Sequence, residues 1–137
     1  MRKKGFTLIE LMIVVIIIAA LAAMIVPRLS GRAEQAKVAV AKSDINANMA
    51  TALKLYQLDN GNFPTTEQGL DALIAKSGSE PAPSNWNGPY LEKNPIDPWS
   101  NPYKYKSPGA NNKGTYDLYS MGPDGIEGTE DDITNWK

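Results

Sequence analysis

The feature that most constrains this chain is an apolar run from Phe6 to Val26 in which Glu10 is the one charged residue. A helix rises ~1.5 Å per residue, so a helix over this run covers the roughly 30 Å hydrocarbon core of a bilayer. We therefore expect residues 6–26 to span a membrane. Basic residues before a span favour a cytoplasmic N-terminus, which places the chain beyond Pro27 outside the cytoplasm. The basic residues are Arg2, Lys3 and Lys4.

A cleaved secretory signal peptide is an alternative interpretation of the same segment. A basic start, an apolar stretch and small residues such as Ala19, Ala20, Ala22 and Ala23 are all compatible with one. The apolar region of a signal peptide usually covers about 7–15 residues, and this run is longer and holds an acid near its start. The sequence therefore favours an anchor that the protein retains.

Glu10 needs its own explanation, because an acid at mid-bilayer costs about 2.5–3.5 kcal/mol on insertion scales. In one interpretation the side chain reaches back to the lipid headgroups. In the other, the chain is cut before Phe6, and the new α-amino group lies one helical turn from Glu10 on the same face. Ammonium and carboxylate would then neutralise one another, within a chain or between neighbouring chains. The residues alone leave both interpretations open.

Composition excludes several classes of function. With 14 basic and 15 acidic residues, and Arg2, Lys3 and Lys4 as the only basic cluster, the chain gives no electrostatic case for binding nucleic acid, so no nucleic-acid partner is expected. Cysteine and histidine are both absent, which excludes disulfides, thiol nucleophiles, Ser-His-Asp chemistry and an ordinary zinc site. A tethered glycosidase would need paired carboxylates, and no acidic pair stands in an evident cleft-forming context. We expect no enzymatic activity.

Beyond Pro27 the sequence favours one continuous helix to about residue 60. Good helix formers dominate to Leu58, and Asn60-Gly61-Asn62 tolerates the left-handed backbone in which many helices end. Proline removes a helical hydrogen bond, so a kink or a locally melted segment is expected at Pro27. An apolar stripe at helical spacing predicts a buried face. Its members are Val38, Ala41, Ile45, Met49, Ala52 and Tyr56.

The C-terminal half reads as a small α+β arrangement. Thr65-Thr66-Glu67-Gln68 has the form of a capping box and predicts a helix of two to three turns to about Lys76. Six prolines between Ser77 and Pro102 argue against sheet there, and three large aromatic residues predict an ordered loop. Residues 103–106 and 116–119 alternate as strands of a hairpin, which must cover the stripe of the long helix.

The chain ends in an acidic segment. Six acids and no lysine or arginine lie between Tyr116 and Trp136. A charge run usually means a solvated loop. The alternative is a calcium site, because Ca²⁺ takes 6–8 oxygens and a glycine-rich turn such as Gly122-Pro123-Asp124-Gly125 can direct carbonyls inward. The spacing does not decide between the two.

The N-terminal residues resemble a known signal. Gly5-Phe6-Thr7-Leu8-Ile9-Glu10 after a short basic leader is similar to the type III signal of type IV pilins and type II secretion pseudopilins. The resemblance implies cleavage between Gly5 and Phe6 by a prepilin peptidase, N-methylation of Phe6, and a role for Glu10 in registering subunits during assembly.

Further motifs resemble the major pseudopilin family of type II secretion systems over essentially the whole chain. The resemblance implies a type IV pilin-like fold and one bound Ca²⁺, with Asp124, Asp131 and Asp132 as side-chain ligands and carbonyls of Met121 and near Ile126 contributing. The motifs that carry it are Phe63 to Leu70, Asp97-Pro98-Trp99, Gly122 to Gly125, Asp131-Asp132-Ile133 and Asn135-Trp136.

The same resemblance implies how the chain is used. Residues 1–5 would be a cleaved leader, residues 6–26 a single inner-membrane span and assembly helix, and residues 27–137 a periplasmic domain. The subunit would form a homopolymer, the pseudopilus, together with minor pseudopilins and an inner-membrane assembly platform. Growth of this filament would drive export of folded proteins. A type IV pilus subunit, for a surface filament or DNA uptake, is the alternative.

Overall fold

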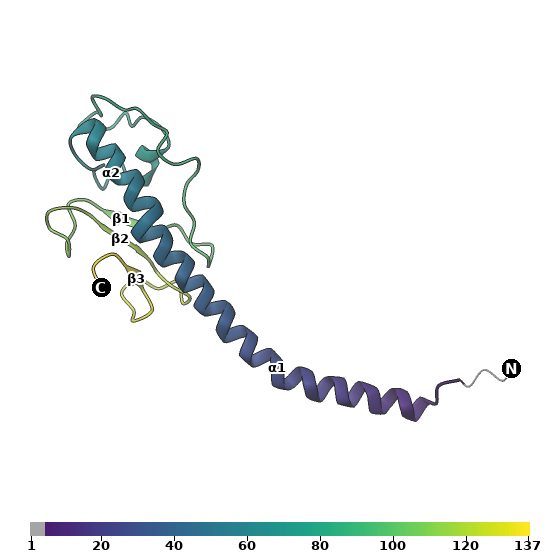
Figure 1. Ribbon diagram of the computed structural model, residues 1–137. Coiled ribbons are helices and arrows are strands. Elements are labelled where there is room, and N and C mark those ends of the chain that lie inside the picture. The colour runs from purple at the N-terminus through teal and green to yellow at the C-terminus, as the bar shows by residue number, and fades with distance from the viewer. Residues whose placement is uncertain (1–4) are drawn as a thin grey trace. The chain divides into compact units, whose positions relative to one another are not determined.

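The structure, a computed structural model, describes residues 5–137, so Arg2, Lys3 and Lys4 and most of the predicted leader lie outside the described residues (Figure 1). The chain divides into two units, Met1–Ala36 and Lys37–Lys137. This division follows contacts within the chain and does not test the membrane boundary predicted at residues 26 and 27. The elements are helix α1 (Leu8–Ser43), π-helical turn η1 (Asp44–Asn48), helix α2 (Met49–Asn60), 3-10 turn η2 (Leu70–Leu73) and strands β1 (Lys104–Lys106), β2 (Asp117–Ser120) and β3 (Ile133–Thr134).

The N-terminal unit is a helix whose apolar side chains are uncovered. Every large apolar side chain from Leu8 to Val26 is about half exposed or more, from 47% for Val14 to 77% for Leu8. The helix is long and apolar enough to cross a membrane by length and composition. Burial of apolar surface is the main favourable term in folding and association, so this segment needs a covering that the chain itself does not supply.

Helix α1 continues through Pro27, so the predicted local melting is wrong for this structure, and the kink stays a prediction. Proline removes one backbone donor, the one that would bond the carbonyl of Ala23. One lost bond is a small part of a 36-residue helix, and the Ser30 hydroxyl donates to the Val26 carbonyl at 3.1 Å. The helical bonds on either side hold the segment through the proline.

In the C-terminal unit the helical stripe is the core, as predicted. Five of its members are at most 3% exposed, and Val38 packs against the same cluster. Other parts of the unit supply Ala72, Leu73, Tyr103, Leu118 and Ile133 to this core. The helical segment therefore owes its place in this unit to apolar packing against the loop and the sheet.

The π-helical turn was not predicted. The Met49 amide donates to the Asp44 carbonyl, five residues back, so this turn holds one more residue than an α-helical turn. At about 100° per residue, Leu53 would lie about 120° around an uninterrupted α-helix from Ala41. The extra residue brings Leu53 back to the buried face, where it is fully buried.

Asp44 ties this turn to the rest of the unit. Its carboxylate accepts a hydrogen bond from Asn48 Nδ2 at 2.8 Å and from the Tyr103 hydroxyl at 2.9 Å. Burial and the neighbouring carboxylate raise the pKa of Tyr103, so its hydroxyl remains a donor. The helix then ends as predicted, because Gly61 adopts φ 84° and donates to the Gln57 carbonyl at 2.7 Å.

The helix predicted from residue 65 to Lys76 is wrong, although its capping box is present. The Thr65 amide donates to Gln68 Oε1 at 2.9 Å, and the Gln68 amide donates to Thr65 Oγ1 at 3.2 Å. Gly69 follows with φ 59° and ψ −165°, which no helix accommodates. The cap is therefore followed only by a 3-10 turn, and Gln68 Nε2 instead binds the carbonyls of Ser79 and Pro81.

The proline-rich segment is an ordered loop, as predicted. Outside the named strands it contains one isolated bridge within the described residues, Ile96 to Pro102. Trp86 Nε1 donates to the Ala72 carbonyl at 2.9 Å, and the Tyr90 hydroxyl donates to Asp59 at 2.6 Å. Both aromatic residues also pack against the core. Buried aromatic mass and these bonds hold the loop in place of sheet pairing.

The predicted hairpin is present, and it has a third strand that was not predicted. Strands β1 and β2 are antiparallel, with Tyr105 opposite Leu118. Strand β3 pairs antiparallel with β2, with Ile133 opposite Ser120, so the sheet order is β1-β2-β3. Two residues cannot display the alternation by which a strand is recognised, so β3 carries no sequence signal of its own.

Asp117 organises the β1–β2 connection. Its carboxylate is 3% exposed and accepts bonds from the amides of Ala110, Asn111 and Asn112 and from Asn111 Nδ2, at 2.8–3.1 Å. A Cβ at Gly109 would lie 2.5 Å from Asp117 Oδ1, so this approach requires glycine. Burial by itself raises the pKa of Asp117, but the bonds from Asn111, Asn112 and Ala110 outweigh it and lower that pKa.

Truncating Leu53 tests whether the extra residue of the π turn places a core side chain. Leu53→Ala is expected to lower the free energy of unfolding by about 2–5 kcal/mol, because a fully buried leucine leaves a cavity. Leu58→Ala, at a side chain 73% exposed on the same helix, is the matched control and is expected to change it little. Thermal or denaturant unfolding of the detergent-solubilised chain measures both. Equal effects of the two changes would contradict this packing.

Asp117→Asn is expected to destabilise the fold by about 1–3 kcal/mol, since an amide replaces one acceptor by a donor that faces backbone donors. The pH dependence follows from the lowered pKa. The contribution of Asp117 is fully present above the pKa of the unfolded chain, about 3.9, and is lost as pH falls through the lower folded-state pKa. Unfolding from pH 7 to pH 2 should show a smaller acid-induced loss in Asp117→Asn than in the wild type; identical pH profiles would count against this role.

Candidate functional site: the N-terminal segment and the C-terminal acidic loop

The predicted cleavage point lies in exposed, non-helical chain. Residues 5–7 precede helix α1, and Phe6 is 88% exposed. A Cβ built at Gly5 would meet nothing within 4 Å among the described residues. Packing therefore does not require a glycine at this position, and the Gly5–Phe6 bond is open to an external enzyme.

Glu10 has partners within its own chain that the sequence analysis missed. The amide and hydroxyl of Thr7 both donate to Glu10 Oε2, at 2.9 and 2.8 Å, and the Glu10 amide donates to Thr7 Oγ1 at 3.2 Å. This is a capping box at the start of helix α1, and the T-x-x-E spacing of Thr7 and Glu10 could have revealed it. The amine of a cleaved Phe6 as partner of Glu10 stays a prediction.

The acidic loop, residues 121–132 between β2 and β3, brings two of the three predicted side-chain ligands together. The Asp124 amide donates to Asp131 Oδ2 at 3.2 Å, and Asp124 Oδ1 accepts from the Ile126 amide at 2.8 Å. Asp132 lies on a different contact, where its Oδ2 accepts from the Gly128 amide at 2.8 Å. Within residues 5–137, no three acidic side chains are grouped closely enough to hold a metal ion together. Carboxylates repel one another unless a cation lies between them.

The Thr129 hydroxyl lies between two acceptor oxygens of this loop. Its hydroxyl lies 2.5 Å from Asp131 Oδ1 and 3.1 Å from the carbonyl of Ile126. A hydroxyl has one proton and can satisfy only one of these acceptors at a time. The bond from Thr129 lowers the pKa of Asp131, which keeps that carboxylate ionised. At Thr129, two acceptors therefore share one hydroxyl donor.

One carboxylate oxygen of the loop is available to coordinate a cation. Asp132 Oδ1 is buried without a hydrogen-bond partner among the described residues. A buried charged oxygen is unfavourable unless it is paired, and the segment from Tyr116 to Trp136 carries no basic side chain. Ca²⁺ binds carboxylate and carbonyl oxygens in flexible geometry. The donor chemistry of the loop therefore fits calcium, although the residues do not form a ready cluster.

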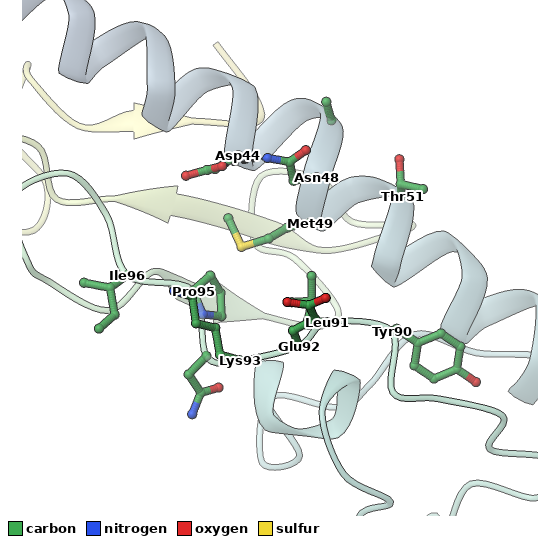
Figure 2. A pocket seen from close by; sticks show the side chains of 12 residues that line it. Asp44, Asn48, Met49, Thr51, Tyr90, Leu91, Glu92, Lys93, Pro95 and Ile96 are labelled. Carbon is green, nitrogen blue, oxygen red and sulfur yellow. Dashed lines mark hydrogen bonds between the residues drawn. The ribbon is translucent and has the colours of Figure 1, made fainter.

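A hollow of the C-terminal unit lies elsewhere. It measures about 740 Å³ and lies between the π turn and the Tyr90 to Ile96 loop (Figure 2). Met49, Leu91 and Pro95 line it together with Asp44 and Glu92. None of the predicted site residues lines this hollow.

Comparison with known proteins shows what this chain is similar to. The family model described as Type II secretion system (T2SS), protein G, matches residues 28–136, and the Prokaryotic N-terminal methylation motif matches residues 1–26. The chain is 54% identical over 98% of its length to the type II secretion system core protein G of Pseudomonas aeruginosa, of which 96% is covered. It is 48% identical over 98% of its length to the core protein G of Escherichia coli K12, of which 92% is covered.

A solved structure gives the same answer for the fold. The crystal structure of the major pseudopilin from the type 2 secretion system of enterohaemorrhagic Escherichia coli matches with a TM-score of 0.69 at 41% identity. The match covers 80% of this chain and 95% of that one. The exposed apolar helix, the three-stranded sheet and these matches agree, and the chain belongs to the type II secretion system protein G family of major pseudopilins.

Proposed function

We propose that this chain is a structural subunit that polymerises into the periplasmic pseudopilus of a type II secretion system. A prepilin peptidase removes residues 1–5, and Phe6 is N-methylated. Before assembly, the subunit crosses the inner membrane once, with its N-terminus in the cytoplasm and residues 27–137 in the periplasm. Growth of the homopolymer, with minor pseudopilins and an assembly platform, drives folded proteins across the outer membrane.

The observation that carries this proposal is the uncovered apolar helix. Large side chains on all sides of residues 8–26 are exposed, and a helix that is apolar all round is stable only inside a membrane or a large apolar core. Lipid covers it in the single subunit. Packing copies of the same helix side by side would cover it again in a filament, so one surface serves both states.

Glu10 supports the assembly step. Two bonds from Thr7 satisfy acceptor sites of its carboxylate but leave its negative charge. An ammonium group on a cleaved Phe6 would cancel the charge, which lowers the free energy of the carboxylate in an apolar filament core. Family membership favours this secretion role over the pilus alternative.

Cleavage can be tested at Gly5. Intact-mass analysis of the membrane-extracted wild type is expected to show a chain that begins at methylated Phe6. Gly5→Val is expected to keep residues 1–5 and to leave the melting temperature unchanged, because a Cβ at this position meets nothing. An intact Met1 in the wild type, or a cut near Ala23 as in a signal peptide, would contradict the proposal.

We further propose that the C-terminal loop binds one Ca²⁺. Asp124, Asp131 and Asp132 would hold it through their side chains, and Met121 and Ile126 through carbonyls. Three observations support this assignment: Asp132 Oδ1 has no hydrogen-bond partner among the described residues, two acceptors lie around the Thr129 hydroxyl, and no lysine or arginine stands between Tyr116 and Trp136. The ion would supply positive charge and cross-link two ends of a loop in a chain without disulfides.

If calcium binds the folded chain and not the unfolded chain, it stabilises the fold by about 2.7 kcal/mol when the free calcium concentration is a hundred times Kd. Adding CaCl2 to the chelator-treated full chain in detergent is therefore expected to raise its melting temperature, and MgCl2 is expected to do so less. Asp124→Ala should lose the response. Glu130→Ala, at an exposed acid of the same loop outside the proposed ligand set, is the matched control and should keep it. A full response in Asp124→Ala would remove this site.

A further inference from the structure

Asp97 is a buried carboxylate whose role the function above does not explain. It is 4% exposed and begins the Asp97-Pro98-Trp99 turn at the end of the proline-rich loop. Its Oδ1 accepts from the amides of Trp99 at 3.0 Å and Asn101 at 2.8 Å. These two bonds close the turn and use one oxygen of the carboxylate.

The other oxygen reaches a different part of the fold. Ser120, the last residue of β2, is fully buried, and its hydroxyl donates to Asp97 Oδ2 at 2.6 Å. The Gly122 amide in turn donates to Ser120 Oγ at 3.1 Å. The proton of the Ser120 hydroxyl is used in the bond to Asp97, which leaves a lone pair of Oγ to accept from the Gly122 amide.

Gly122 is the point where the two ends of the acidic loop meet. It adopts φ +65°, and a Cβ there would lie 2.4 Å from the Asp131 carbonyl oxygen. It directly follows Met121 and stands two residues before Asp124, both proposed to bind calcium. The bond to Ser120 therefore fixes the backbone from which the first half of the proposed site is built.

We propose that Asp97 is a positioning residue for the calcium site and acts through Ser120. This inference rests on the proposed calcium site. Within the described residues, the hydrogen bonds of the Asp97 carboxylate go to Trp99, Asn101 and Ser120 and to none of the proposed ligands. Asp97 holds Ser120, and Ser120 holds Gly122. These bonds set the Met121 carbonyl and Asp124 relative to Asp131. Residues that orient metal ligands typically change metal affinity about 10–100-fold when they are replaced.

Asp117 offers a matched control. It is also a buried carboxylate on β2, at 3% exposed, and it also accepts amide bonds from a turn. That turn is residues 110–112, and its bonds do not involve the acidic loop. Removing the charge of Asp117 therefore destabilises the same sheet without acting on the calcium ligands.

The experiment compares four full-length chains in detergent micelles: wild type, Asp97→Asn, Ser120→Ala and Asp117→Asn. Isothermal titration with CaCl2 gives Kd, and unfolding in chelator gives stability without the ion. Asp97→Asn and Ser120→Ala are expected to weaken calcium binding about tenfold or more. Asp117→Asn is expected to lower the chelator melting temperature and to leave Kd nearly unchanged.

The four chains distinguish failure of the positioning role from failure of the calcium site. If the wild type binds calcium and both Asp97→Asn and Ser120→Ala bind it equally well, the positioning role is wrong and the calcium site stands. If Asp117→Asn weakens binding as much as Asp97→Asn does, the effect is general destabilisation, which also overturns the role. If the folded wild type does not bind calcium, the proposed site fails and the inference fails with it. If Asp97→Asn does not fold, the calcium Kd of Ser120→Ala, which lacks only a hydroxyl, tests the role: weaker binding supports it and an unchanged Kd overturns it.

Discussion

The structure depends first on an apolar helix that its own chain leaves uncovered. From Leu8 to Val26 each large side chain is about half exposed or more, so this segment is stable only when lipid or other copies surround it. Glu10 is the charged residue in this apolar surface. Its hydrogen bonds with Thr7 cap the start of the helix and fill acceptor sites of the carboxylate, but they leave its negative charge. Membrane anchoring and assembly are two consequences of one uncovered surface.

The C-terminal unit contains much irregular chain and no cysteine, so other interactions must hold its loops in place. Buried or half-buried carboxylates do this repeatedly. Asp44 fixes the π turn, Asp117 closes the β1–β2 connection, and Asp97 links its own turn to the end of β2. Each accepts hydrogen bonds from backbone or hydroxyl donors, which compensate for burial of the charge. In the acidic loop, Asp132 Oδ1 lacks such a donor among the described residues.

The sequence predicted the features that depend on periodicity. The stripe from Val38 to Tyr56, the helix end at Gly61 and the hairpin were all recognised by spacing or turn chemistry. It did not predict the features that depend on contacts distant in sequence. These are the π turn that buries Leu53 and the two-residue strand β3. It also extended the helix at Thr65 too far, because Gly69 breaks it. At the sites, motif resemblance named the proposed ligands, but only three-dimensional contacts show that Asp132 Oδ1 has no hydrogen-bond partner among the described residues. The capping box of Thr7 and Glu10 has a spacing that the sequence displays but the prediction did not use.

We infer that lipid covers the segment from Leu8 to Val26 in the subunit and that copies of the same segment cover it in the filament. The natural chain has no cysteine, so a single Ile16→Cys variant reports on this position alone. In cells with a working secretion system, oxidation is expected to link copies through residue 16, and a membrane-impermeant thiol reagent is expected not to label it. Ready labelling by that reagent without linked copies would show a segment exposed to water and contradict this inference.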